Sequence, residues 1–126
     1  MLELRNVTKT FAKGTVNEHT ALKNISLTLK EKRVLLIDCD LRNPSDGTIL
    51  GVNMEKGFVD YLSGEAPINE CMFNSQMLRI GDGFKFVFVP GGSAIEDGTK
   101  YLGSERMRAV VQSLREYADY VILDSA

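Results

Sequence analysis

The sequence predicts an α/β protein, with a mainly parallel sheet flanked by helices from residue 33 onward and an antiparallel strand pair before it. Three observations support this prediction. Val34–Ile37, Phe84–Val89 and Tyr120–Asp124 contain short apolar runs, which are typical of strands covered on both faces in a parallel sheet. The stretch 104–117 has apolar residues at helical spacing. Residues 2–29 instead alternate between apolar and polar, as antiparallel strands with one buried face do.

Length and composition limit the class of protein. With 126 residues the chain has room for one domain, which is large enough for a hydrophobic core. Its 44% hydrophobic and 25% charged residues are typical of a folded soluble protein. The net charge of −2 argues against nucleic acid as a partner.

The charge is unevenly distributed along the chain. Residues 1–33 carry seven Lys/Arg and three Asp/Glu, whereas residues 34–126 carry eight and fourteen. Such asymmetry indicates either a basic arm on an acidic domain or two segments of different origin. We expect the second, with a boundary that separates residues 1–32 from residues 33–126.

The sequence predicts a cytoplasmic protein without a transmembrane segment. No stretch is long enough to span a bilayer, and the charged start MLELRNVTKTF is unlike a signal peptide. Cys39 and Cys71 are too far apart for a C-x-x-C motif, and with the single His19 they cannot form a zinc site. We expect both cysteines to be small buried residues with reduced thiols.

Within residues 1–32 we expect two antiparallel strands. Leu2, Leu4 and Val7 begin an alternating pattern, and Ala21–Leu29 resumes it. The polar stretch Ala12–Thr20 between them is typical of a hairpin loop.

The acidic stretch after the first buried strand is the main candidate site. Asp38 and Asp40 follow Val34–Ile37 directly, at the carboxyl end of the strand, where ligands bind in open α/β sheets. Two residues apart on an extended chain, their side chains point the same way and can share one cation. The alternative is that Asp38 caps the turn after the strand, as Asp commonly does. The whole pattern D-C-D-L-R-N-P favours a role with metal and nucleotide.

Short elements are expected in the middle of the chain. Leu41–Val52 predicts a turn and a short connection. Gly57–Leu62 predicts one helical turn with its aromatic and leucine residues facing inward, ended by Gly64, and Pro67 begins a second short helix.

Two further strands are expected before the last helix. Ser75–Ile80 and Phe84–Val89 predict strands separated by the Gly-Asp-Gly turn at 81–83. The second of these strands brings Gly91 and Gly92 to the carboxyl edge that also holds Asp38.

The last predicted elements are a helix and a strand. Ser104–Tyr117 is the clearest helix of the chain, and its arginines are expected on a solvated face. The residues expected on its buried face are Met107, Val110, Val111 and Leu114. The final strand ends with Asp124, which places a third carboxylate at the carboxyl edge of the sheet.

Several of these segments resemble one family. VLLIDCDLRNPS resembles the second acidic motif, Walker A′, of bacterial tyrosine kinases that control capsule and exopolysaccharide synthesis, which are MinD/ParA-like P-loop ATPases. GFVDYLSGEAPINEC, FVFVPGG and LGSERMRAVVQSLREYADYVILDSA continue the resemblance across residues 33–126, and YVILD is similar to the Walker B strand. The resemblance implies a P-loop-NTPase-like fold that uses Mg²⁺ and ATP, and the chain is small for a complete domain of that kind, so we expect an incomplete domain.

The same resemblance implies roles for particular residues. Asp38, Asp40 and Asp124 would surround the magnesium ion of Mg-ATP, and Asp38 or Asp40 would help to activate a tyrosine hydroxyl. The residues expected to lie near the nucleotide are Arg42, Gly91 and Gly92. The resemblance also implies two kinds of partner, a membrane adaptor of the polysaccharide co-polymerase type and further copies of the chain in a homo-oligomer. The protein would then work at the inner face of the membrane.

A second resemblance covers residues 1–31. LELRNVTKTFAKGTVNEHTALKNISLTLKE is similar to the start of ATP-binding subunits of ABC transporters. In that family the aromatic residue at the position of Phe11 stacks on the adenine ring, which implies a nucleotide contact for Phe11. From the residues alone, a core aromatic is the alternative.

One motif that both families carry is absent from this chain. The sequence contains no G-x-x-x-x-G-K-[ST], the loop whose backbone N–H groups and lysine surround the phosphates of a nucleotide. We therefore expect a truncated or chimeric relative of a tyrosine kinase that is inactive alone. The alternatives are a nucleotide-binding fragment of an ABC transporter and a non-enzymatic interaction module.

Overall fold

The computed structural model describes residues 3–11, 19–28, 32–53, 55–80 and 85–126, with side chains from residue 32 onward. The chain divides into two compact units, the first made of residues 1–31 and the second of residues 32–126. Each unit contains a sheet of its own.

The first unit is an antiparallel pair of strands. Strand β1 (Glu3–Phe11) pairs with β2 (His19–Thr28), with register shifts typical of β-bulges along the ladder. This confirms the predicted strand pair, although β2 begins two residues before the predicted start. Most of the predicted hairpin loop, residues 12–18, lies outside the described residues.

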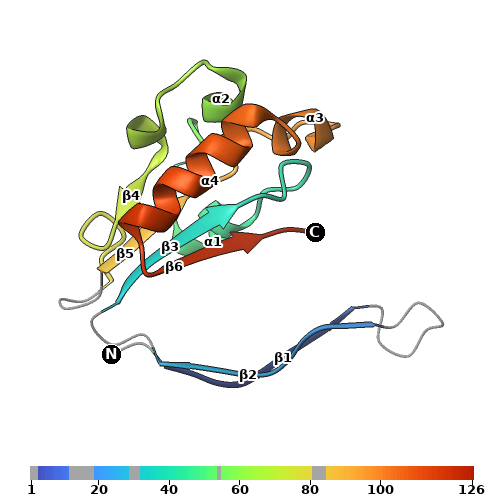
Figure 1. Cartoon of the computed structure of the whole chain (residues 1–126), viewed down its shortest axis with the longest axis vertical. Coiled ribbons are helices and arrows are strands. Elements are labelled where there is room, and N and C mark those ends of the chain that lie inside the picture. The colour runs from blue at the N-terminus through green and yellow to red at the C-terminus, as the bar shows by residue number, and fades with distance from the viewer. Residues whose placement is uncertain (1–2, 12–18, 29–31, 54, 81–84) are drawn as a thin grey trace. The chain divides into compact units, whose positions relative to one another are not determined.

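The second unit contains a four-stranded sheet with the strand order β4-β5-β3-β6 (Figure 1). Strand β3 runs parallel to both β5 and β6, and only β4 is antiparallel, so the predicted mainly parallel sheet is confirmed. The strands are β3 (Arg33–Asp38), β4 (Phe73–Asn74), β5 (Lys85–Val89) and β6 (Tyr120–Asp124).

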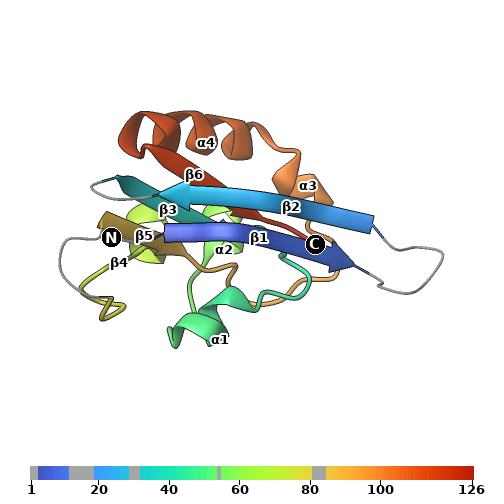
Figure 2. The same ribbon diagram turned by 90° about the horizontal axis from the view of Figure 1, so that it is seen from below.

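Helices cover both faces of this sheet. Figure 2 shows α4 (Glu105–Tyr117) on one face and the short α1 (Asp46–Leu50) on the other. The remaining helices are α2 (Phe58–Ser63), the 3₁₀ helix η1 (Ile68–Cys71) and α3 (Thr99–Leu102). The core between sheet and helices is made of buried apolar side chains, among them Leu35, Ile37, Phe58, Leu62, Cys71, Val89, Val110 and Leu114.

Helix α4 confirms the clearest sequence prediction. Its N-cap is Ser104, whose hydroxyl accepts a hydrogen bond from the Met107 N–H at 3.2 Å and satisfies one of the free donors of the first turn. Val110 and Leu114 are buried against the sheet, whereas the arginines of this helix are exposed as predicted. The helix therefore buries a narrow apolar stripe.

Helix α2 and η1 also follow the sequence prediction. Phe58 and Leu62 are buried, and Gly64 ends α2 in the left-handed conformation at φ 87°. Val59 is buried as well, which the pattern did not single out. Pro67 precedes η1, as expected from its fixed backbone angle.

Some predictions of local structure are wrong. Ser75–Ile80 is not a strand but a series of turns, closed by hydrogen bonds such as Ile80 N–H to the Ser75 carbonyl at 3.0 Å. Leu41–Val52 is more than a connection because it contains α1, and α3 was not predicted. The predicted turn at 81–83 lies outside the described residues.

Two global expectations can be compared with the described part of the chain. Cys39 and Cys71 are both buried and free, as predicted. Among the described residues, no helix has the length and apolar character needed to cross a membrane.

Candidate functional site

The carboxyl ends of β3 and β6 bring two predicted site residues side by side. Asp38 and Asp124 are register partners at the ends of these parallel strands. The Cys39 N–H donates to the Asp124 carbonyl at 2.7 Å, so the ladder continues one residue beyond β3. The expectation that both aspartates lie at one edge of the sheet, on neighbouring strands, is confirmed.

The side chain of Asp38 is hydrogen bonded to backbone N–H groups. It is 1% exposed, and its two carboxylate oxygens accept from the Asp40 N–H at 3.0 Å and from the Asp46 N–H at 3.2 Å. The first bond closes the turn after β3, and the second meets the first residue of α1. This is the capping role that the sequence left open as an alternative.

Burial determines the electrostatics of Asp38. Loss of hydration raises its pKa above the ordinary value of 3.8, and the charges of Asp124 and Asp40 add to this rise. The two backbone N–H donors act in the opposite direction but do not cancel it. Asp38 is therefore a carboxylate whose ionised form is disfavoured by its site.

Asp40 and Arg42 lie in a different environment, on the rim of a pocket of about 300 Å³. Asp40 is half-buried, and its Oδ1 accepts from the Asn43 N–H at 3.1 Å, while Arg42 is exposed. The other residues that line the pocket are Cys39, Leu41, Glu96, Asp97, Gly98, Thr99, Leu102, Ser125 and Ala126. The pocket thus lies where the chain leaves β3 and β6.

The predicted metal ligands do not form one cluster. In the part of the chain that the structure describes, no group of three or more His, Cys, Asp or Glu side chains could hold a metal ion. Each oxygen of Asp38 accepts one backbone hydrogen bond, so a metal ion would share these oxygens with the Asp40 and Asp46 N–H groups. Magnesium carried by a nucleotide needs only one or two carboxylates besides phosphate and water, and Asp40 in the open pocket fits that requirement.

The Gly91–Gly92 pair lies at the same edge, where it holds α2. The carbonyls of Pro90 and Gly91 accept from the Phe58 and Val59 N–H groups at 2.7 and 3.0 Å, which satisfies donors of the first turn of α2.

The fit around this glycine pair is very close. A Cβ on Gly57 would lie 2.1 Å from the backbone nitrogen of Gly92, and Gly92 has φ 91°. A Cβ on Gly91 would lie 2.7 Å from the Pro44 side chain and 3.5 Å from the carboxyl carbon of Asp38. The sequence signal for this contact is Gly57, the first residue of the predicted helical turn, but its partner is far along the chain.

Cys39 lies between Asp38 and Asp40 in the chain, but its thiol is not activated. It is 6% exposed, and burial raises the pKa of its thiol to about 12, with the Asp38 and Asp124 charges adding to the rise. A thiol in this state is not a nucleophile near neutral pH. The side chain of Phe11 lies outside what the structure describes, so its predicted nucleotide contact stays a prediction.

Comparison with known proteins gives a consistent result. No family model matches the chain. The chain is 27% identical to the tyrosine-protein kinase CpsD of Streptococcus agalactiae, over 99% of this chain and 51% of that protein. It is 31% identical to the tyrosine-protein kinase Wzc of Salmonella typhi, over 75% of this chain and 12% of Wzc.

A solved structure agrees with these relatives. The kinase domain of the Escherichia coli tyrosine kinase ETK superposes with a TM-score of 0.66 and 25% identity, over 75% of this chain and 35% of that one. The chain is homologous to bacterial tyrosine kinases. The P-loop-kinase-like sheet expected from the resemblance is therefore confirmed, as part of such a domain.

The matched relatives are longer than this chain. The chain spans about half the length of the CpsD relatives that it matches. The resemblance of residues 1–31 to ABC transporter subunits finds no support, because the CpsD match extends over 99% of the chain. The separate origin of residues 1–32 stays a prediction.

Proposed function

We propose that this chain is the acidic-motif segment of a bacterial protein-tyrosine kinase of exopolysaccharide synthesis, and that it transfers no phosphate on its own. The observation that carries the proposal is the pairing of Asp38 with Asp124 at the ends of two neighbouring parallel strands, beside a pocket lined by Asp40 and Arg42. Homology to bacterial tyrosine kinases supplies the class of reaction.

In this proposal the burial and hydrogen bonds of each site residue determine its role. Bound Mg-ATP supplies the phosphoryl group and a cation. Exposed Arg42 would bind phosphate oxygens, and half-buried Asp40 would help to hold the hydrated magnesium. Asp38 is a positioning residue, because its bonds to the Asp40 and Asp46 N–H groups fix the turn that carries Asp40 and Arg42. Asp124 contributes negative charge at the same edge.

Weak binding follows from the missing phosphate loop. Phosphoryl transfer relies on positioning and charge neutralisation, which the loop provides through its backbone N–H groups and lysine. Without it, the carboxylates at this edge repel a triphosphate, and Arg42 is the cation lining the described pocket. Losing one well-placed donor costs about 3 kcal/mol of transition-state stabilisation, and here a whole set is absent from the sequence.

Calorimetric titration with Mg-ATP tests the binding part of the proposal. We expect weak binding that Arg42→Ala lowers about tenfold, since a charge-assisted bond to phosphate is lost. The matched control is Arg108→Ala on α4, whose guanidinium is engaged with Glu105 at 2.8 Å and should not affect the titration. Equal affinity for wild type and Arg42→Ala would remove the pocket from the proposal.

Radiolabelled ATP tests the catalytic part. We expect no label on the purified chain or on an added tyrosine-containing peptide in the presence of magnesium. Transfer of label by wild type that both Asp38→Asn and Asp40→Asn abolish would show an active chain and contradict the proposal.

Partners are part of the same proposal. A membrane adaptor of the polysaccharide co-polymerase type and neighbouring copies of the chain would supply the missing positive charge in trans, at the cytoplasmic face of the membrane. Light scattering with and without Mg-ATP tests the oligomer. A monomer mass under both conditions, at concentrations well above the calorimetric Kd, would contradict the homo-oligomer.

A further inference from the structure

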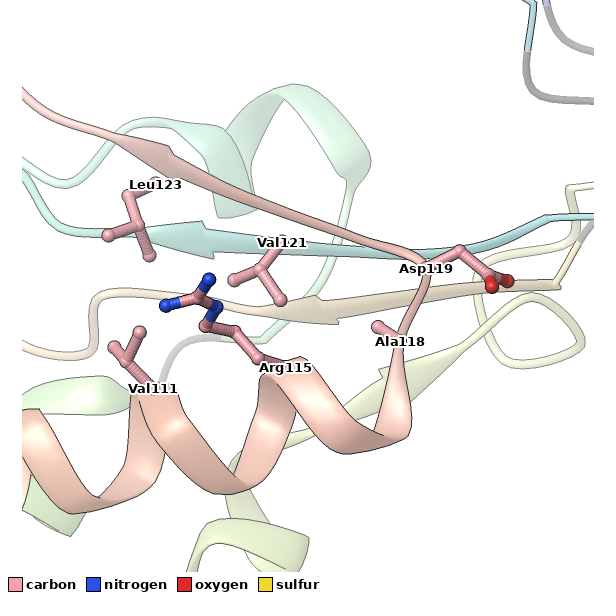
Figure 3. A pocket seen from close by; sticks show the side chains of 6 residues that line it. All are labelled: Val111, Arg115, Ala118, Asp119, Val121 and Leu123. Atoms are coloured by element: carbon pink, nitrogen blue, oxygen red, sulfur yellow. The ribbon is translucent and has the colours of Figure 1, made fainter.

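Two further features of the second unit lie outside the pocket beside Asp40. One is a groove of about 350 Å³ between α4 and β6, and Figure 3 shows its lining side chains converging from the helix and the strand. Its polar lining is one cation, Arg115, and one carboxylate, Asp119, so its charges favour no class of ligand. The other feature is the contact between α2 and the loop after β5, which reaches Asp38 and is therefore connected to the candidate site.

The start of α2 and the loop 90–92, the glycine loop, leave no space for a side chain between them. A Cβ on Gly57 would lie 2.1 Å from the Gly92 nitrogen, and a Cβ on Gly92 would lie 2.9 Å from the Asp60 carboxylate. The same carboxylate accepts from the Gly57 N–H at 2.7 Å and closes the first turn of α2. Groups packed this closely cannot shift independently, so a movement of the first turn of α2 displaces the glycine loop.

The loop that begins with Pro90 also holds the turn after β3. A Cβ on Gly91 would lie 2.7 Å from the Cβ of Pro44. Further along the loop, the Ile95 N–H donates to the Leu41 carbonyl at 3.0 Å. Leu41 and Pro44 are on either side of Arg42 in the chain, so the loop holds the segment that carries this arginine at both of its ends.

The second half of α2 is attached to the start of α4. The Arg106 Nε donates to the Tyr61 carbonyl at 2.9 Å, and its guanidinium carbon lies 4.6 Å from the centre of the Tyr61 ring. Arg106 is exposed and Tyr61 is half-buried. Helix α2 thus connects a contact at the surface with the carboxyl edge of the sheet, through a continuous series of packed and hydrogen-bonded groups.

We propose that α2 is a positioning element of the candidate site, which controls the turn 41–44 through the glycine loop. A displacement of the first turn of α2 moves the glycine loop, the loop moves Pro44, and Pro44 moves Arg42 relative to a bound phosphate. By thermodynamic linkage, a ligand that shifts this turn also changes the stability of the first turn of α2. The role of the pocket rests on the proposed function, whereas the coupling itself rests on these contacts.

The first experiment acts on the contact between Gly91 and Pro44. In Gly91→Ala the new Cβ is 2.7 Å from Pro44 but 3.5 Å or more from the atoms of Asp38, so Pro44 has to give way. We expect ¹H–¹⁵N NMR spectra to show a displaced amide signal for Asn43, whose N–H is bonded to the Asp40 carboxylate. In a Pro44→Gly background the colliding Cβ is absent, and Gly91→Ala should displace the same signal much less. Equal displacement in both backgrounds would overturn the proposal.

The second experiment acts on α2 and remains decisive if Gly91→Ala does not fold. Asp60→Ala removes the carboxylate that closes the first turn of α2. The matched control is Ser63→Ala, which removes a hydrogen bond of 3.1 Å to the Asp60 carbonyl in the same helix, away from the glycine loop. We expect Asp60→Ala to displace the Asn43 signal and Ser63→Ala to leave it in place. A signal that Asp60→Ala does not move, or that both variants move equally, would overturn the proposal.

Titration with Mg-ATP relates the coupling to the proposed function. Gly91→Ala and Asp60→Ala should each weaken binding about threefold to tenfold, whereas Ser63→Ala should not. Circular dichroism verifies that each variant is folded. If wild type binds no Mg-ATP, the proposed function fails, and the NMR displacements still decide the coupling. Unchanged affinity in Asp60→Ala with a displaced Asn43 signal would overturn the role of α2 in positioning the site.

Discussion

Strands β3 and β6 are neighbours with nearly the same kind of sequence, yet they have opposite surroundings. Both consist of an apolar run that ends in Asp, and residues 34–38 of β3 pair in register with residues 120–124 of β6. Leu35 in β3 is fully buried, whereas Leu123 in β6 is 43% exposed. An apolar run therefore predicts a parallel strand, but the neighbours in the sheet decide how much of it is buried.

The aspartates at the ends of the two strands differ in the same way. Asp38 is buried, with both oxygens bonded to backbone N–H groups, whereas Asp124 is half-buried and the described hydrogen bond at that residue uses its backbone carbonyl. Identical residue types at paired positions thus perform different tasks, one structural and one at the surface of the carboxyl edge.

Thiol labelling should give the largest contrast between the strands. In a Cys71→Ala background at about pH 8, Cys39 at the end of β3 should react about a thousandfold more slowly than an ordinary thiol, because its pKa is about 12 instead of 9.0. A thiol introduced by Leu123→Cys, with Cys39→Ala, should react at nearly the ordinary rate. Reaction with an aromatic disulfide, followed by absorbance, measures both rates. Equal rates would show that β6 is covered.

Truncation of matched leucines is the next test. Leu35→Ala should lower the free energy of unfolding by about 3 kcal/mol, since it removes a fully buried side chain and leaves a cavity. Leu123→Ala should lower it by less than about 1 kcal/mol, because much of that side chain is already in water. Urea titration followed by circular dichroism gives both values. A larger loss from Leu123→Ala would contradict the comparison.

Hydrogen exchange should show a smaller difference in backbone protection. The amides of Leu35, Leu36 and Ile37 lie in a strand paired on both sides and should be among the slowest of the protein. The β6 amides that point away from β3 should exchange at least about tenfold faster. Mass spectrometry of overlapping fragments resolves the two segments. Equal exchange rates in the two segments would contradict the comparison.

The pH dependence of stability should give the smallest effect. Since the folded-state pKa of Asp38 is raised above 3.8, the folded state binds this proton more tightly than the unfolded chain does. The contribution of Asp38 to stability is therefore most favourable below about 3.8 and falls as the pH rises through the folded pKa. Urea titrations at a series of pH values test this. The free energy of unfolding of wild type, compared with that of Asp38→Asn, should fall as the pH rises from about 3.8 through the folded-state pKa of Asp38.

A matched variant tests the cause of that loss. Asp124→Asn removes a neighbouring carboxylate that raises the pKa of Asp38, so the loss with rising pH should become smaller. A difference between wild type and Asp38→Asn that rises with pH would show that the pKa is lowered instead.

The sequence was sufficient for the three parallel strands and the main helix, though not for β4, because their signals are local. The apolar runs of β3 and β5, and the Ser104 cap with its helical stripe, need no knowledge of distant residues. Helix α1 has no such signal, because it is only five residues long and contains Gly47. Its first residue is Asp46, whose N–H donates to the Asp38 carboxylate. That bond joins residues eight apart and is invisible to a periodicity argument.

The false strand at Ser75–Ile80 has a related cause. Its apolar residues are Met77, Leu78 and Ile80. Arg79 has φ 55°, however, and the Asn74 side chain accepts from the Met77 N–H at 3.0 Å, which closes a turn. Local hydrogen bonds of this kind compete with strand pairing.

The candidate site was predictable in position but not in detail. The carboxyl edge follows from strand direction alone, so Asp38, Asp124 and Gly91 were expected there. Two details could not be predicted because they depend on contacts between distant segments. One is that Asp38 is the carboxylate bonded to backbone N–H groups, and the other is that Gly91 and Gly92 pack against the start of α2. The pocket beside Asp40 depends on Gly98 and Thr99, which no motif indicated.

The central position of β3 has a consequence for how the second unit is made in the cell. During synthesis this strand leaves the ribosome first, but Asp119, which meets Arg33, follows 86 residues later. At about 5–20 residues per second that delay is roughly 4 to 17 s. Through this time the most apolar strand of the unit has no partner on its β6 side, and pairing of such distant segments is slow. Nascent chains held before Tyr120 should therefore be the form most dependent on chaperones.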